Sequence, residues 1–212
     1  MNSTLQTILE TGVIAIMRSK SATGLVDAAR ALASGGVRAI EVTMTTPGAL
    51  EAIAAAASDS SGDYVIGAGS VLDAESADLA IQAGAEFLVM PVAALDAVRV
   101  AKGCGKVAVP GAFTPTEILS CMQAGADLVK VFPASSVGPG YIKSVLAPLP
   151  QAPLVPVGGV HADNAGDYIR AGAVAVGVGG ALVNTQVLAR GDWRELTESA
   201  RRYVDAIAAA RN

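Results

Sequence analysis

Histidine, cysteine and runs of basic residues are scarce in this chain, and each shortage narrows the functions open to it. The 212 residues contain a single histidine, His161, which argues against His-rich metal sites and against Ser–His or Cys–His catalytic machinery. The two cysteines, Cys104 and Cys121, do not follow the spacing of a disulfide framework. Because the sequence also shows no secretory signal, we interpret them as reduced thiols and expect a cytoplasmic protein.

Charge and hydropathy argue against two further classes of partner. The formal net charge is −4 and no basic run is present, so nucleic acid is not expected as a partner. No apolar run reaches the roughly 18 residues that a membrane-spanning helix needs, so we expect no membrane partner. Hydrophobic residues make up 52% of the chain and charged residues only 16%. This balance suffices for a large core and favours a homo-oligomer that buries part of its surface.

Short apolar runs recur along the whole chain and predict eight β-strands. Their starts lie about 20–26 residues apart, which is the spacing of a strand, a loop and one helix in repeated βα units. The runs are apolar throughout rather than alternating, and this is typical of parallel strands that are covered on both faces. The predicted strands are Val13–Arg18, Ala39–Met44, Tyr64–Gly69, Phe87–Pro91, Lys106–Gly111, Leu128–Pro133, Leu154–Val160 and Ala173–Gly180.

Helix signals fill the segments between these runs. Thr114-Pro115-Thr116-Glu117 combines an N-cap Thr, a Pro at the first helical position and the Glu of a capping box, and Thr46-Pro47 is similar. The first ten residues form an amphipathic stretch that predicts a short N-terminal helix. Four of the predicted helices end on a glycine suited to left-handed backbone just before the next strand, namely Gly36, Gly84, Gly125 and Gly172.

The unbroken alternation predicts an α/β fold, specifically a single-domain (β/α)8 TIM barrel over residues 1–212 with a short N-terminal helix. An open doubly wound sheet is the structural alternative, although no Gly-x-Gly-x-x-Gly follows the first strand. In (β/α)8 barrels the chemistry lies at the carboxyl ends of the strands, so candidate site residues are expected there.

Two charged residues interrupt the apolar strands, Lys130 in the sixth run and Glu41 in the second. Removing an ammonium from water costs several kcal/mol unless a partner offsets it, so a lysine inside a strand calls for an explanation. Alternation along the strand turns Val129 and Val131 toward the helices and Lys130 toward the interior. An inward amine and an inward acid are the equipment of imine chemistry. A buried structural ion pair is the alternative.

Glycines end the last two predicted strands, at Gly158-Gly159 and at Gly179-Gly180. Backbone without side chains lets N–H groups approach an anion, and (β/α)8 barrels commonly hold phosphate at this place. Tight turns that need a positive φ are the alternative explanation. Arg18 ends the first strand and could pair with a carboxylate, or it is a solvated loop residue. His161 is interpreted as a loop or helix-start residue, and a contact with phosphate is the less favoured alternative.

The motifs, taken together and in order from about Ile14 to Val183, resemble the 2-keto-3-deoxy-6-phosphogluconate (KDPG) aldolases and their 4-hydroxy-2-oxoglutarate and 6-phosphogalactonate relatives. The combination is specific, whereas any single motif is weak. The motifs are Gly35-Gly36-Val37 leading to Glu41-Val42-Thr43, Gly67-Ala68-Gly69-Ser70-Val71, Pro110-Gly111 with Thr114-Pro115-Thr116-Glu117, Lys130-Val131-Phe132-Pro133-Ala134, and Pro156-Val157-Gly158-Gly159-Val160.

The resemblance implies a role for each matching residue. Lys130 matches the Schiff-base lysine and Glu41 the general acid/base of this class I family. Phe132 and Pro91 match residues that line the pocket, and Gly158-Gly159 matches the phosphate-binding turn. The family is metal-independent, uses no cofactor and is commonly trimeric, so the resemblance implies a homotrimer here.

Three positions depart from the family pattern. Thr45 stands where many members carry an arginine for the substrate carboxylate, and Arg18 is able to take over that role. Ser70 replaces a threonine and keeps its hydroxyl, so we expect Arg18, Thr43 and Ser70 to orient the carboxylate. Gly180 stands where a serine often contacts phosphate. Glycine has no hydroxyl, so only the backbone N–H groups of Gly179 and Gly180 remain to contact a phosphate there.

The expected reaction is reversible cleavage of a 2-keto-3-deoxy-6-phospho sugar acid to pyruvate and glyceraldehyde 3-phosphate. Cleavage of 4-hydroxy-2-oxoglutarate to pyruvate and glyoxylate is a further expected activity, and the galactonate-series sugar acid is an alternative substrate. Two other interpretations stay open at this point. One is a phosphate-binding barrel of other chemistry, such as a phosphosugar epimerase, and the other is a non-catalytic oligomeric scaffold.

Overall fold

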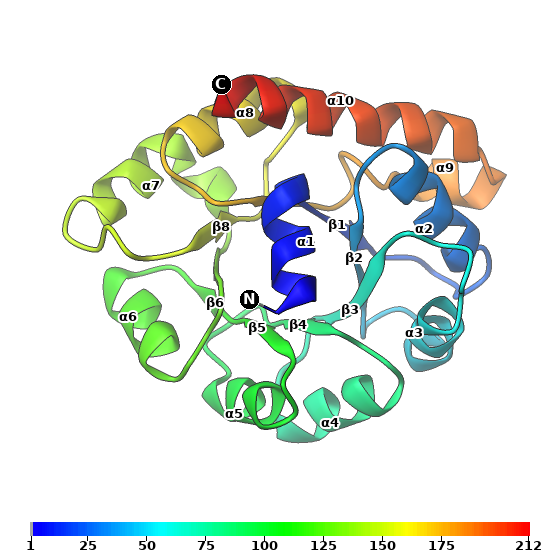
Figure 1. The fold of residues 1–212 in the computed structure, drawn as a ribbon, viewed down its shortest axis with the longest axis horizontal. Coiled ribbons are helices and arrows are strands. Elements are labelled where there is room, and N and C mark those ends of the chain that lie inside the picture. The colour runs from blue at the N-terminus through cyan, green and yellow to red at the C-terminus, as the bar shows by residue number, and fades with distance from the viewer. Residues whose placement is uncertain (1) are drawn as a thin grey trace.

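Parallel strands at the centre of the molecule are surrounded by helices in a computed structural model that describes residues 2–212 (Figure 1). Six strands form one sheet in the order β5-β4-β3-β2-β1-β9, and three form a second in the order β6-β7-β8. All of the strand pairs are parallel. The strands are β1 (Val13–Met17), β2 (Ala39–Thr43), β3 (Val65–Gly69), β4 (Phe87–Val89), β5 (Val107–Val109), β6 (Gly111–Ala112), β7 (Val129–Val131), β8 (Leu154–Pro156) and β9 (Val176–Val178).

Each predicted run contains a strand, but the fifth run is divided into β5 and β6 at Pro110. Proline has no N–H to donate to a ladder, so pairing is interrupted there. The expected single eight-stranded ladder is therefore replaced by two curled sheets. Individual contacts join them: Lys130 N donates to Pro110 O at 2.9 Å, and Val157 forms an isolated bridge with Gly177.

Apart from α1, which lies across the ring of strands, the helices lie outside the strands (Figure 1). Within residues 2–212, no helix is long and apolar enough to cross a membrane. The helices are α1 (Ser3–Thr11), α2 (Leu25–Ser34), α3 (Ala49–Ala57), α4 (Ala74–Gln82), α5 (Leu95–Gly103), α6 (Pro115–Gln123), the 3-10 helix η1 (Ala134–Ser136), α7 (Gly138–Leu146), α8 (Ala162–Arg170), α9 (Thr185–Arg190) and α10 (Trp193–Arg211).

Local signals explain where several helices begin. Thr114 caps α6 in a capping box with Glu117, as the sequence predicts. The predicted start of α3 at Thr46 is wrong, because Gly48 is the N-cap and Thr46 is buried. The Thr46 hydroxyl instead accepts a hydrogen bond from Ser19 N at 3.2 Å, which ties the end of α3's entry loop to the loop after β1.

The predicted glycine turns are confirmed at the helix ends. The four glycines adopt φ between +94° and +105°, a region in which a Cβ is strained. Because the turns recur after α2, α4, α6 and α8, each returns the chain to the start of the next strand in the same way.

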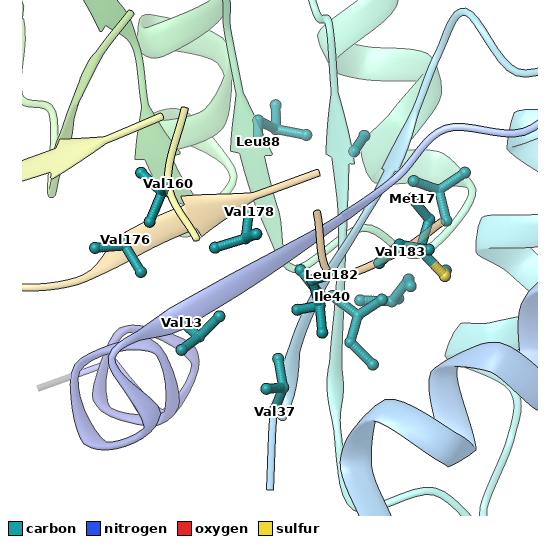
Figure 2. Close-up of a cluster of buried hydrophobic side chains, with 14 of the residues drawn as sticks. Val13, Met17, Val37, Ile40, Leu88, Val160, Val176, Val178, Leu182 and Val183 are labelled. Atoms are coloured by element: carbon teal, nitrogen blue, oxygen red, sulfur yellow. The ribbon is translucent and has the colours of Figure 1, made fainter. Parts of the chain in front are cut away.

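Apolar side chains form an outer core between strands and helices and an inner core enclosed by the strands. Figure 2 shows part of the outer core, including Val13, Ile40 and Val178. Members of the inner core alternate with outer ones along the strands, so that Leu128 points inward and Val129 outward. At the amino end of the strands, α1 contributes Ile8 to the inner core and lies across the ring in Figure 1. The carboxyl ends of the strands remain as the open end.

Candidate active site

A cavity of about 500 Å³ lies at the carboxyl ends of the strands. Every strand except β5 and β6 supplies a lining residue, either from the strand itself or from the loop after it. The lining includes all of the predicted site residues except Thr43. These residues are Arg18, Glu41, Ser70, Pro91, Lys130, Phe132, Gly158, Gly159, Gly179 and Gly180.

Lys130 lies in the middle of β7 and is 7% exposed. Its side chain points into the cavity, with Nζ 4.8 Å from the centre of the Phe132 ring. Burial lowers the pKa of Lys130, because the ammonium loses its water; Glu41 opposes this shift and Arg18 adds to it. The effect of burial on the pKa of Lys130 outweighs that of Glu41. A lowered pKa supplies a neutral amine, which is the nucleophilic form.

Glu41 lies in β2 and is 2% exposed. Its Oε2 is buried and has no hydrogen-bond partner among the described residues. Burial raises the pKa of Glu41 to about 7, against the smaller opposing effects of Lys130 and Arg18. A carboxyl group with this pKa exchanges protons near neutral pH, as a general acid/base requires.

Glu41 and Lys130 line the same cavity without forming an ion pair. Among residues 2–212, no oxygen of Glu41 lies within 4.0 Å of Lys130 Nζ. The two groups still influence each other's pKa, so they are close enough to interact through the cavity. A structural ion pair would be in contact and fully hydrogen-bonded. Both groups instead face the cavity separately, so each is available to a molecule that enters it.

Arg18 and Ser70 add polar groups to the cavity. Arg18 follows β1 and is exposed, so its guanidinium is available to an anion that enters from solvent. Ser70 follows β3 with a φ of +60°, a left-handed conformation that is uncommon outside glycine. Such backbone often occurs where a side chain is aimed at a functional site.

The glycine turns after β8 and β9 also line the cavity. Gly158 and Gly159 have φ values of +95° and +70°, and a Cβ on Gly159 would lie 2.7 Å from the Ser135 Cβ. Turn geometry therefore requires glycine at these two positions, whatever else the turn does.

Thr43 is the one predicted residue that the structure does not bring to the cavity. It is buried, and its hydroxyl pairs with those of Thr45 and Thr46, both at 3.2 Å. The strand period places Thr43 on the inner face, but the turn after β2 engages the hydroxyl. The predicted role in orienting a carboxylate is therefore not supported by this geometry.

Several lining residues were not predicted as site residues. Ile16 lies two positions before Arg18 on the same face of β1, and strand alternation could have identified it. Ala181 and Val183, after β9, lie in an irregular segment with no periodic signal, and Thr185 begins α9. Among the described residues, no cluster of three or more His, Cys, Asp and Glu side chains could hold a metal ion.

Comparison with known proteins identifies relatives over nearly the whole chain. The family model described as KDPG and KHG aldolase matches residues 5–199. A 2-dehydro-3-deoxy-phosphogluconate aldolase of Treponema pallidum is 37% identical over 87% of this chain and 88% of its own. A 2-dehydro-3-deoxy-6-phosphogalactonate aldolase of Escherichia coli is 36% identical over 80% of this chain and 83% of its own.

Solved structures agree with this assignment. The KDPG aldolase of Legionella pneumophila, crystallised with pyruvate captured as a covalent carbinolamine, superposes with a TM-score of 0.86 at 25% identity. The match covers 93% of this chain and 96% of the other. The curled parallel sheet with helices outside it is therefore a fold shared with solved KDPG aldolases.

Proposed function

We propose that this chain, which belongs to the KDPG and KHG aldolase family, is a Schiff-base aldolase that acts through Lys130 and Glu41. Its membership of this family identifies it as a lyase of the aldolase type. The proposed reaction is reversible cleavage of a 2-keto-3-deoxy-6-phospho sugar acid to pyruvate and glyceraldehyde 3-phosphate. One observation carries this proposal: a buried lysine and a buried, unpartnered glutamate face one cavity without pairing to each other.

The first half of the reaction would form an imine on Lys130. The neutral Nζ attacks the C2 ketone and gives a carbinolamine, which loses water to become a protonated imine. Burial favours this sequence at its start, because it lowers the pKa of Lys130 and so populates the neutral amine. Glu41 would donate the proton with which the C2 hydroxyl leaves as water.

The second half would break the C3–C4 bond. Glu41, now a carboxylate, takes the proton from the C4 hydroxyl, and the C4–O bond becomes the carbonyl of the departing aldehyde. The electron pair of the C3–C4 bond moves onto the imine and gives an enamine. Protonation of C3 and hydrolysis then release pyruvate and regenerate Lys130. A pKa of about 7 lets Glu41 accept and return protons in one cycle.

The cavity residues divide into binding roles in this proposal. Arg18 and Ser70 would hold the carboxylate next to C2, the guanidinium through charge-assisted hydrogen bonds. Pro91 and Phe132 supply apolar walls, and the Phe132 ring also lies beside Lys130 Nζ. The turns at Gly158-Gly159 and Gly179-Gly180 would receive the phosphate through backbone N–H groups.

Two architectural proposals accompany the chemistry. We infer that the two sheets form one closed (β/α)8 barrel and that residues 1–212 form one domain; the hydrogen bonds between the sheets support this.

We also propose a homotrimer, as the family resemblance implies. Exposed apolar side chains support a buried interface, namely Leu72 after β3, Leu79 on α4 and Val92 after β4. Light scattering after gel filtration measures the mass of the assembly and so tests the proposed homotrimer.

Cleavage assays with both sugar-acid epimers test the proposed substrate. Pyruvate release is followed with lactate dehydrogenase and NADH, and the gluconate-series acid is expected to be cleaved. The galactonate-series acid is the second candidate, which the Escherichia coli relative favours. Release of pyruvate from neither epimer nor from 4-hydroxy-2-oxoglutarate, by folded protein, would contradict the proposal. Loss of activity in EDTA would favour the metal-dependent alternative instead.

A further inference from the structure

The glycines after β9 are not required by the packing of the protein. Gly180 has no heavy atom within 4 Å of the position that a Cβ would occupy, and the nearest to Gly179 is the Ile16 Cβ at 4.0 Å. Neither glycine has a positive φ. Turn strain and crowding, which explain Gly158 and Gly159, are therefore absent here. The space beside Gly179 and Gly180 belongs to the cavity and is open to a ligand.

His161 also lines the cavity, two residues after the Gly158-Gly159 turn. Its backbone N–H donates to the Asn164 Oδ1 at 2.7 Å, and the Asn164 Nδ2 donates to Gly159 O at 3.0 Å. Asn164 thus fixes the start of α8 and the glycine turn. No hydrogen bond within residues 2–212 engages the imidazole, and the side chain is exposed. The side chain is not needed to hold this turn in place.

Polar side chains are few in the part of the cavity formed by the loops after β8 and β9. Besides His161, the lining from these loops comprises glycines, valines, Ala181 and the hydroxyl-bearing Thr185. A phosphate monoester there would meet backbone N–H groups, one hydroxyl and one imidazole. An imidazole N–H is the only group of this set that can also carry positive charge.

We infer that His161 is a specificity-determining residue, which binds the terminal phosphate of the substrate and favours phosphorylated over unphosphorylated sugar acids. This inference rests on the proposed aldolase function. It gives the substrate phosphate a side-chain hydrogen-bond donor, which Gly180 cannot supply. Charge-assisted hydrogen bonds to phosphate are about twice as strong as neutral ones, so the preference falls when His161 is removed. Thr185, at the start of α9, would add a neutral hydrogen bond.

Matched kinetics separate this role from a structural one. The substrates are 2-keto-3-deoxy-6-phosphogluconate and the same acid without phosphate, so that only the phosphate differs. His161→Gln is expected to lower kcat/KM for the phosphorylated acid about tenfold more than for the unphosphorylated acid, mainly through KM. Lys143→Gln, which removes an exposed cation on α7 outside the cavity lining, is the control and should keep the wild-type ratio. An equal loss on both acids with His161→Gln overturns the inference and leaves the aldolase function intact.

The single histidine permits a direct measurement of binding. The imidazole C2–H resonance of the protein arises from His161 alone. Glycerol 3-phosphate, which has no carbonyl, is titrated into wild type and into Lys130→Met, and a saturable shift of this resonance is expected in both. Glycerol at the same concentrations is the control and should leave the resonance in place. No shift with glycerol 3-phosphate overturns the inference, whereas a shift in a protein without aldolase activity separates phosphate binding from the failure of the proposed function.

Discussion

The side chain of Glu41 occupies the space where a side chain on Gly69 would stand. The two residues lie on the adjacent strands β2 and β3, and a Cβ built on Gly69 would overlap the Glu41 carboxyl group. Gly69 does not have a positive φ, so its backbone conformation is open to other residues. The glycine is therefore required by its neighbour, and it lets a buried carboxyl group face the cavity.

Gly69→Ala is expected to inactivate the enzyme by displacing Glu41. A shift of about 1 Å in a catalytic group can cost on the order of 100-fold in rate, so we expect at least that loss in kcat/KM. Gly140→Ala on α7 is the control, because no atom lies within 4 Å of the added Cβ. Wild-type activity in folded Gly69→Ala would show that the position of Glu41 does not matter to the reaction.

Glu41→Gln is expected to stabilise the protein at alkaline pH while it impairs catalysis. The folded-state pKa of about 7 lies above the usual value of 4.5. Between these values the folded state holds a proton that the unfolded state has lost, so wild-type stability falls as pH rises from about 4.5 to about 7. Glutamine removes this penalty, which is on the order of 3 kcal/mol above pH 7.

Urea unfolding of wild type and Glu41→Gln at pH 5 and pH 8 measures this difference. The variant should gain stability relative to wild type between the two pH values. Glu51→Gln, at an exposed position on α3, is the matched control. A variant that loses stability relative to wild type at pH 8 would indicate that the Glu41 carboxylate is held by favourable interactions.

Arg18→Ala is expected to raise the KM for the sugar acid about 10- to 100-fold, because the guanidinium is the only exposed cation among the lining residues proposed to bind the carboxylate. Lys20→Ala removes a cation two residues further along the same loop, outside the cavity lining, and is the control. In the Arg18→Ala background, Thr45→Arg would restore an arginine where many relatives carry one. Equal KM values for Arg18→Ala and Lys20→Ala would argue against the role.

Much of the inner arrangement could be predicted from the sequence because strand alternation is local. The two-residue period places Lys130 with Leu128 inside and Val129 outside, and the structure confirms this division. The same rule puts Glu41 inside. Helix ends were also predictable where one residue decides them, as at Gly84 and Gly125, whose φ values are +103° and +95°.

Features that depend on the surroundings of a residue could not be predicted in this way. Thr43 obeys the strand period, yet its hydroxyl is engaged by Thr45 and Thr46, which only the folded turn brings together. The division of the fifth predicted strand into β5 and β6 depends on the neighbours of Pro110. Its missing N–H interrupts the ladder only where a neighbouring strand would have accepted that hydrogen bond. The close contact between Gly69 and the Glu41 side chain involves two strands and has no signal in either one.

Borohydride trapping with pyruvate tests the central claim, that Lys130 forms an imine, most directly. Wild type and Lys130→Met are incubated with pyruvate and sodium borohydride, and intact mass and peptide mapping locate any adduct. The account predicts one reduced pyruvate adduct on Lys130 in wild type and none on folded Lys130→Met. A folded wild-type protein without an adduct, or an adduct that persists in Lys130→Met, would contradict it.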